Sequence, residues 1–224
     1  MAYDKEKLWY FGYEPATCRI QHQRGESVTN LLSSRDWGLR ERSALAVVLA
    51  HVVLHCSESS WLDNNWSKDH LMFFKKESAE PEFDRPFLII DFERESAESV
   101  QNSPKGLHPN PTILALGILL LEIYTRTTIE SLRKVEYLSG GQTNPNTDLT
   151  TAIKVLDERQ GDPQVRYRQA VRECLFWKIG DRGDDGHVDM EEQRRKIYEK
   201  VVVPLELELR DGFPGNDSLC AVCG

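Results

Sequence analysis

The feature that most constrains the fold is an apolar run at residues 113–123, which reads ILALGILLLEI. Only Gly117 and Glu122 interrupt it. A helix that crosses a bilayer needs about 20 apolar residues, and this run is clearly shorter. A helix that is hydrophobic on every side but too short to span a membrane is typically buried inside a domain. The sequence therefore predicts a central buried helix over residues 112–125, in which a charge at Leu119 or Leu120 is not tolerated.

Composition narrows the class of protein. The chain has 224 residues, of which 40% are hydrophobic and 29% charged, and these values are typical of one large globular domain. The net charge of −8 argues against nucleic acid or an anionic membrane surface as a partner. Five scattered cysteines indicate a reducing compartment, and the first residues lack the apolar core of a secretory signal. We therefore expect a cytoplasmic protein.

The remaining pattern predicts a mainly α domain with a small β element. Strands are expected at 71–74 and at the apolar run 87–92, FLIIDF. Pro204 is expected to end or kink the last helix. We expect the chain to divide into three parts, namely an aromatic-rich N-terminal segment or cap (1–25), a helical domain (26–210) and a flexible C-terminal tail (211–224). The other helices are expected at 26–33, 39–55, 149–159, 165–177 and 190–203.

The order of several short motifs resembles the C-lobe of a eukaryotic protein kinase. LAVVLAHVVLH ends in a Leu-His pair, SWLDNNWSKDHLMFF precedes FLIIDFERE, and LGILLLEI is followed by the Cys-Leu pair of RYRQAVRECLFW. More narrowly, the chain is similar to a fungal degenerate kinase-like domain found in proteins related to heterokaryon incompatibility and prion-inhibition modules. This resemblance implies a C-lobe-like helical fold that lacks a complete N-lobe.

The same resemblance places the weak candidates for catalysis. Asp63, in Trp-Leu-Asp, falls at the catalytic base, and Asp91, in Asp-Phe-Glu, falls at the metal-binding aspartate. Lys68 then stands where an asparagine should hold metal. A second alignment, made backwards from the strand, puts Trp66 at the base, Lys68 at the lysine and Leu71 at the asparagine. Neither alignment preserves all three roles.

The parts that clamp a nucleotide are missing. No GxGxxG loop precedes the first long helix. Lys154, in TAIKVL, comes after the buried helix and reads as a surface lysine. Thr112 replaces the aspartate that braces the catalytic loop in kinases. Since phosphoryl transfer depends on positioning and charge neutralisation, these losses indicate a pseudokinase with no cofactor and no small-molecule substrate.

For each candidate site residue, a purely structural role is an alternative to the functional one. Asp63 and Asp91 also suit turns or strand ends. His51 and His55 have the spacing of a metal-binding pair on a helix, but no third ligand is evident, so we expect ordinary packed or surface histidines. The Cys220–Cys223 CxxC pair is half of a zinc set, and we interpret it as part of a loose tail.

Aromatic residues are the candidates for an interaction surface. Trp61 and Trp66 either pack their loop on the core or form a partner-binding surface. Separately, the N-terminal aromatics, among them Trp9 and Tyr10, either cap the exposed face of the domain or mark a docking surface. The leading hypothesis is a non-catalytic protein-interaction module, which the resemblance places in fungal self/non-self or death signalling. The alternative is an atypical metal-dependent phosphotransferase that uses Asp91 and Asp63.

Overall fold

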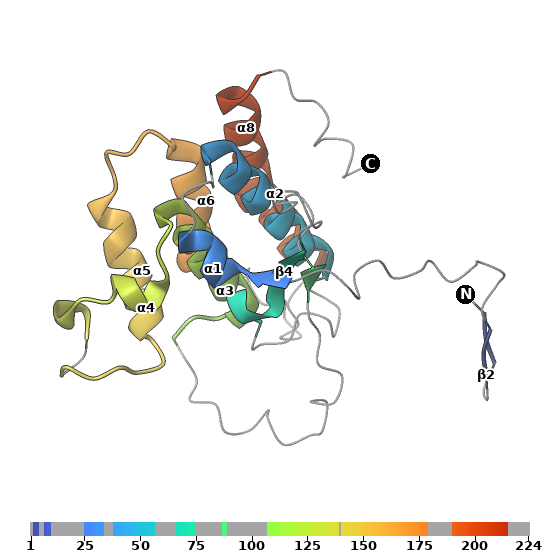
Figure 1. Cartoon of the computed structure of the whole chain (residues 1–224), viewed down its shortest axis with the longest axis horizontal. Helices are drawn as coiled ribbons and strands as arrows, with labels where there is room; N and C mark the ends of the chain where they lie inside the picture. The colour runs from blue at the N-terminus through green and yellow to red at the C-terminus, as the bar shows by residue number, and fades with distance from the viewer. Residues whose placement is uncertain are drawn as a thin grey trace.

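The structure is a computed structural model of the whole chain, and it describes residues 2–4, 7–9, 25–33, 38–56, 66–74, 87–88, 107–138, 140–178 and 190–214. These residues form a mainly helical protein with small antiparallel sheets, as the sequence predicts. Figure 1 shows α4 and α5 on one side of the molecule and α2 and α8 on the other, with α3 and α6 between them.

Helix α3 (Pro111–Thr125) is the predicted buried helix. Asn110 caps it by accepting a hydrogen bond from the Ile113 amide, and Pro111 suits the first turn because its missing N–H would have no helical partner there. The helix packs against α2 (Leu39–Cys56), α5 (Thr147–Glu158) and α6 (Val165–Leu175), so both its faces are covered. The prediction is confirmed by the buried side chains, which are Ile113, Leu116, Leu119, Leu120, Leu121, Glu122 and Ile123.

Gly117 has a packing role at the crossing of α3 and α6. A Cβ atom at this position would lie 2.7 Å from Cys174 Cβ, which is closer than two carbons can approach. The backbones therefore meet only because no side chain stands between them. Nearby, the buried Tyr167 hydroxyl donates a hydrogen bond to the Leu120 carbonyl at 2.9 Å.

The last helix continues through Pro204. It consists of α7 (Met190–Ile197), a π turn (η5, Tyr198–Val202) and α8 (Val203–Gly212). Of the two outcomes expected at Pro204, an end of the helix is therefore wrong, and the helix is instead distorted into a π turn directly before the proline. Proline in an α-helix meets the carbonyl four residues earlier, and a π turn directly before Pro204 changes that spacing while Val203 N–H still reaches the Tyr198 carbonyl. The helix can thus remain packed on α2 and α6.

A three-stranded antiparallel sheet lies beside the helices. Its order is β3 (Gly25–Ser27), β4 (Leu71–Phe74) and β5 (Phe87–Leu88), with Gly25 opposite Phe74 and Leu71 opposite Leu88. The bounds of β4 agree with the prediction, whereas residues 89–92 of the second predicted strand lie outside the described residues. The predicted two-stranded element missed β3, because Gly-Glu-Ser has no β-forming side chain and forms a strand only by pairing with β4.

The other elements are short. Strands β1 (Ala2–Asp4) and β2 (Lys7–Trp9) pair antiparallel within the aromatic-rich N-terminal segment. Among the described residues, no helix has both the length and the apolar character needed to cross a bilayer. The remaining short elements are α1 (Val28–Ser33), η2 (Lys68–His70), α4 (Ile129–Leu132) and η4 (Val135–Tyr137).

Candidate functional site

The structure brings few of the predicted site residues together. Trp9 ends β2, where its backbone pairs with Ala2. Trp66 is 4% exposed and belongs to the core, so its indole packs the chain inward and does not offer an interaction surface. Thr112 lies in the first turn of α3, and Lys154 is exposed on α5 as expected. The candidates that lie outside the described residues are Asp63, Asp91, Trp61, Tyr10, Cys220 and Cys223.

A partly buried ion cluster is centred on Lys68, in the segment that the resemblance assigns to the catalytic loop. Lys68, in η2, donates hydrogen bonds to Glu122 Oε1 and Glu130 Oε2, each at 2.7 Å. Glu122 is 1% exposed, and its Oε1 also accepts the Ile129 amide at 2.7 Å. The one charged residue of the apolar run is therefore buried, and its Oε1 accepts two hydrogen bonds, as a buried carboxylate requires partners.

Burial and mutual contact shift the pKa values of the three residues in this cluster. Burial raises the pKa of Glu122, and its bonds to Lys68 and Ile129 only partly oppose this effect. Burial by itself lowers the pKa of Lys68. The hydrogen bonds to Glu122 and Glu130 outweigh this effect, so the pKa of Lys68 is raised overall. Glu130 is also penalised by burial, yet Lys68 lowers its pKa overall. The Lys68 ammonium is thus committed to two carboxylates.

This cluster has a structural consequence. It ties η2, which precedes β4, to the C-terminal half of α3 and to the start of α4. The same η2 turn carries a capping box, in which Ser67 Oγ accepts the Asp69 amide and His70 Nδ1 accepts the Ser67 amide. The turn is therefore fixed at both its ends.

The histidine pair on α2 is engaged within the protein. His51 Nε2 lies 2.7 Å from Glu206 Oε1 on α8, and the rings of His51 and His55 stack with centroids 5.9 Å apart. The described part of the chain contains no group of three or more His, Cys, Asp or Glu side chains placed to hold a metal ion. His51 thus joins helices α2 and α8, and His55 stacks on His51.

An open groove of about 970 Å³ lies where the end of α2 meets α7. Met190 and Tyr198 supply its apolar surface and are 41% and 45% exposed, while Leu54 of α2 is 9% exposed. Met190, Arg194 and Tyr198 are spaced four residues apart, which places them along one face of the helix. The charged residues that line the groove are Glu191, Glu192, Arg194 and Arg195.

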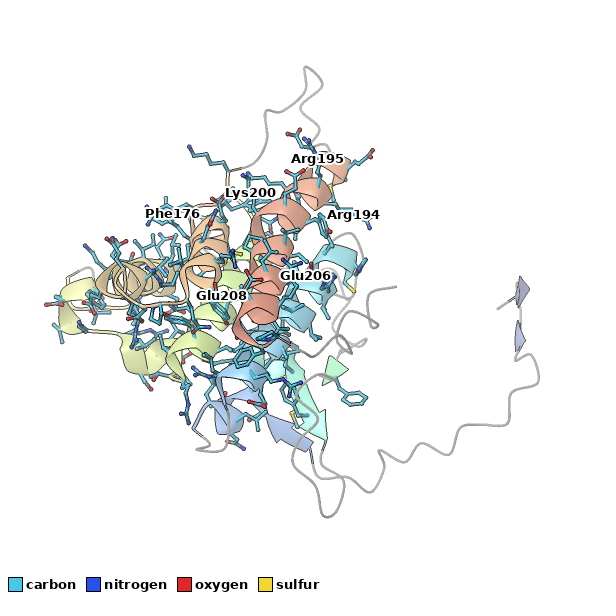
Figure 2. All side chains as sticks on the ribbon, turned by 90° about the horizontal axis from the view of Figure 1, so that it is seen from above. Phe176, Arg194, Arg195, Lys200, Glu206 and Glu208 are labelled. Carbon is cyan, nitrogen blue, oxygen red and sulfur yellow. The ribbon has the colours of Figure 1, made fainter. Side chains whose placement is uncertain are left out.

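The rim of this groove carries both signs of charge. Arg195 Nη2 lies 3.9 Å from Glu192 Oε1, and the Arg195 side chain is 65% exposed. Figure 2 shows Arg194 and Arg195 at the outer end of the last helix, with Lys200 between them and Phe176. Phe176 is 45% exposed and lies under the Arg172 guanidinium at 4.9 Å. Cations and exposed aromatic rings therefore continue from the groove onto α6.

Sequence reasoning missed the groove. The segment MEEQRRKIYEKVV shows one apolar side, on which Ile197 and Val201 are buried. Met190 and Tyr198 gave a weak signal, because they are large apolar residues outside that buried stripe. The pattern does not tell which helix lies opposite, so a groove against Leu54 of α2 could not be predicted.

Comparison with known proteins gives one match. The model of a domain of unknown function, DUF7580, matches residues 13–212. Neither the curated proteins nor the solved structures gave a match.

Proposed function

The chain belongs to the DUF7580 family of domains of unknown function, and on this premise we propose that it is a non-catalytic module that binds a partner protein in the groove between α2 and α7. The observation that carries the proposal is the exposure of Met190 and Tyr198 inside this groove. Methionine and tyrosine are enriched at protein interfaces, and methionine adapts to differently shaped partners. Charges of both signs on the rim would set the orientation of the partner.

The non-catalytic part of the proposal is supported by Lys68. In the alignment made from the strand, this residue takes the position of the catalytic-loop lysine. It is bonded here to Glu122 and Glu130, both at 2.7 Å, and a substrate phosphate would have to compete with two carboxylates for it. This agrees with the missing phosphate loop and with Thr112 in place of the bracing aspartate. A pseudokinase-like module of fungal self/non-self or death signalling, acting in the cytoplasm, is the context that we propose.

The groove is tested by site-specific crosslinking. A photoreactive amino acid is placed at Tyr198 and, as a matched control, at Val165, which is 61% exposed on α6. We expect a discrete crosslinked partner from position 198 only. Binding of that purified partner should be lost in Met190→Asp and retained in Val165→Asp. Equal crosslinking at both positions, or binding that Met190→Asp leaves unchanged, would overturn the proposed groove.

The absence of catalysis is tested separately by calorimetric titration with ATP, with and without magnesium or manganese. We expect no heat of binding in the titration, and no change in the unfolding temperature of the protein when ATP is added. Metal-dependent binding that disappears in Asp91→Ala would support the phosphotransferase alternative and make Asp63 the next residue to test.

A further inference from the structure

Three lysines gather beside two aromatic rings where the C-terminal end of α6 meets the last helix. Lys196 Nζ lies 4.3 Å from the centroid of the Trp177 ring and also donates a hydrogen bond to the Lys178 carbonyl. Lys200 follows Lys196 by four residues, so the two lysines share one side of the helix. Figure 2 shows Phe176 and Lys200 where α6 and η5 pack on each other. We call Phe176, Lys178, Lys196 and Lys200 the lysine patch.

The lysine patch lies apart from the groove between α2 and α7. Lys196 is on the side of the last helix that faces α6, where it contacts Trp177. On the other side of the buried Ile197, Met190 and Tyr198 line the groove with the end of α2. The patch shares no residue with the lining of the groove, so an inference about it goes beyond the docking proposed there and does not depend on it.

The positive charge of the lysine patch exceeds the negative charge beside it. Within the described part of the chain, its three lysines form no ion pair. Burial lowers the pKa of Lys196. The charges of Glu173 and Glu192 oppose this effect, and the like charges of Lys178 and Lys200 add to it. The three ammonium groups therefore outnumber the two carboxylates that act on Lys196, and Glu192 is already paired within the last helix.

Packing within the protein accounts for only one of the three lysines. The Lys196 ammonium group is held by the Trp177 ring and by the Lys178 carbonyl. The side chains of Lys178 and Lys200 are exposed, and neither makes such a contact among the described residues. These two charges are therefore available to a carboxylate that comes from another molecule.

Phe176 adds an apolar contact to the lysine patch. It directly follows α6, and its side chain is 45% exposed. The Arg172 guanidinium lies 4.9 Å from the centroid of its ring, so a further cation borders the ring. Exposed aromatic residues are typical of the centres of protein interfaces. The patch thus offers cations and an apolar surface together.

We propose that the lysine patch binds an acidic segment of a partner protein and places an aromatic residue of that segment against Phe176. Acidic side chains complement the three lysines, and contact between two aromatic rings buries apolar area. A nucleic acid or an anionic membrane is disfavoured, because such an extended polyanion would meet the net charge of −8 of the whole chain. A short acidic segment meets mainly the local charge, since salt screens charges beyond about 10 Å.

The experiment follows the fluorescence anisotropy of a labelled peptide as the full chain is added. In this peptide, three glutamates stand on each side of a single phenylalanine. We expect saturable binding that weakens as the salt concentration rises. Binding should be about ten-fold weaker in Lys178→Gln/Lys200→Gln and should also weaken in Phe176→Ala. Peptides with glutamine in place of every glutamate, or glycine in place of the phenylalanine, should bind more weakly than the first peptide.

The matched control is Lys134→Gln/Lys154→Gln, which removes the same two charges from residues on or paired with α5. Its affinity for the peptide should equal that of the wild type, as should that of Tyr198→Ala in the groove. Equal weakening in the two double variants, unchanged binding in Lys178→Gln/Lys200→Gln, or anisotropy that does not saturate would overturn the proposal. Equal or tighter binding of an oligothymidine with six phosphates would overturn it in favour of a nucleic acid.

Discussion

Lys68 Nζ and Glu122 Oε1 lie 2.7 Å apart, although the two residues are 54 positions apart in the chain. Lys68 belongs to the turn before β4, and Glu122 lies in the last part of α3. The contact places a carboxylate that is 1% exposed next to the cation that neutralises it, and it anchors the sheet to the central helix.

The first prediction concerns this pair. Lys68→Met should lower the free energy of unfolding by about 3–5 kcal/mol, because Glu122 would remain buried without its cation. The double variant Lys68→Met/Glu122→Gln should recover most of this loss, since a neutral amide needs no cation and its Oε1 can still accept the Ile129 amide. Urea unfolding measures both values. Glu130→Gln is the control, because Glu130 is 51% exposed and should change stability by less than about 1 kcal/mol. A double variant no more stable than the single one would contradict this account.

The second prediction concerns the close approach of α3 and α6. Gly117→Ala should destabilise the protein by about 1–3 kcal/mol, because the new Cβ would lie 2.7 Å from Cys174 Cβ. Helix propensity alone predicts the opposite sign, since alanine is favoured over glycine by about 1 kcal/mol in a helix. Gly161→Ala is the control, because a Cβ there meets nothing within 4 Å. Thermal unfolding decides the sign, and a stabilised Gly117→Ala protein would show that the helices separate at little cost.

The third prediction concerns the centre of α3. Leu120→Asp should prevent folding, because position 120 is 0% exposed and lies within the hydrophobic core, where a new carboxylate would be buried. Circular dichroism and gel filtration should show loss of helix and of compactness. Val165→Asp, at a position that is 61% exposed, should change stability by no more than about 0.5 kcal/mol. A soluble and folded Leu120→Asp protein would refute the burial of this helix.

The fourth prediction concerns pH and Tyr124. Burial, and next the hydrogen bond to Asp162, raise the pKa of Tyr124 from 10 to about 12. Because the pKa is higher in the folded state, the fold favours the neutral phenol. The contribution of the neutral Tyr124 phenol to the free energy of unfolding is therefore complete below pH 10, and it is lost as the pH rises through 12. Phenolate absorbance of the wild type minus that of Tyr124→Phe should give a midpoint near pH 12.

Two further measurements accompany this titration. Tyr124→Phe should cost about 1 kcal/mol at neutral pH through its lost hydrogen bond, and the difference from the wild type should shrink above pH 10. Asp162→Asn removes the acceptor carboxylate and should move the midpoint of Tyr124 downward. A midpoint near 10 in the wild type would show that the hydroxyl does not engage Asp162.

The sequence by itself determined the longest helices and strand β4. Composition and a short run of apolar residues were enough to predict α3 as a buried helix, because a helix with no polar face has no other stable place in a globular protein. The long helix α2 and strand β4 were likewise predicted from local patterns, with bounds that agree with the structure. These features depend on residues that are close together in the chain.

Only the tertiary structure decided which distant residues and elements contact one another. The partner of Glu122, the approach of Gly117 to Cys174 and the pairing of β3 with β4 each join residues far apart in sequence. Helical periodicity gives the buried side of one helix but not the identity of its neighbour, so Met190 and Tyr198 gave only a weak signal of the groove between α2 and α7. Electrostatic and packing energies at these contacts depend on distances of a few ångströms, and folding alone sets those distances.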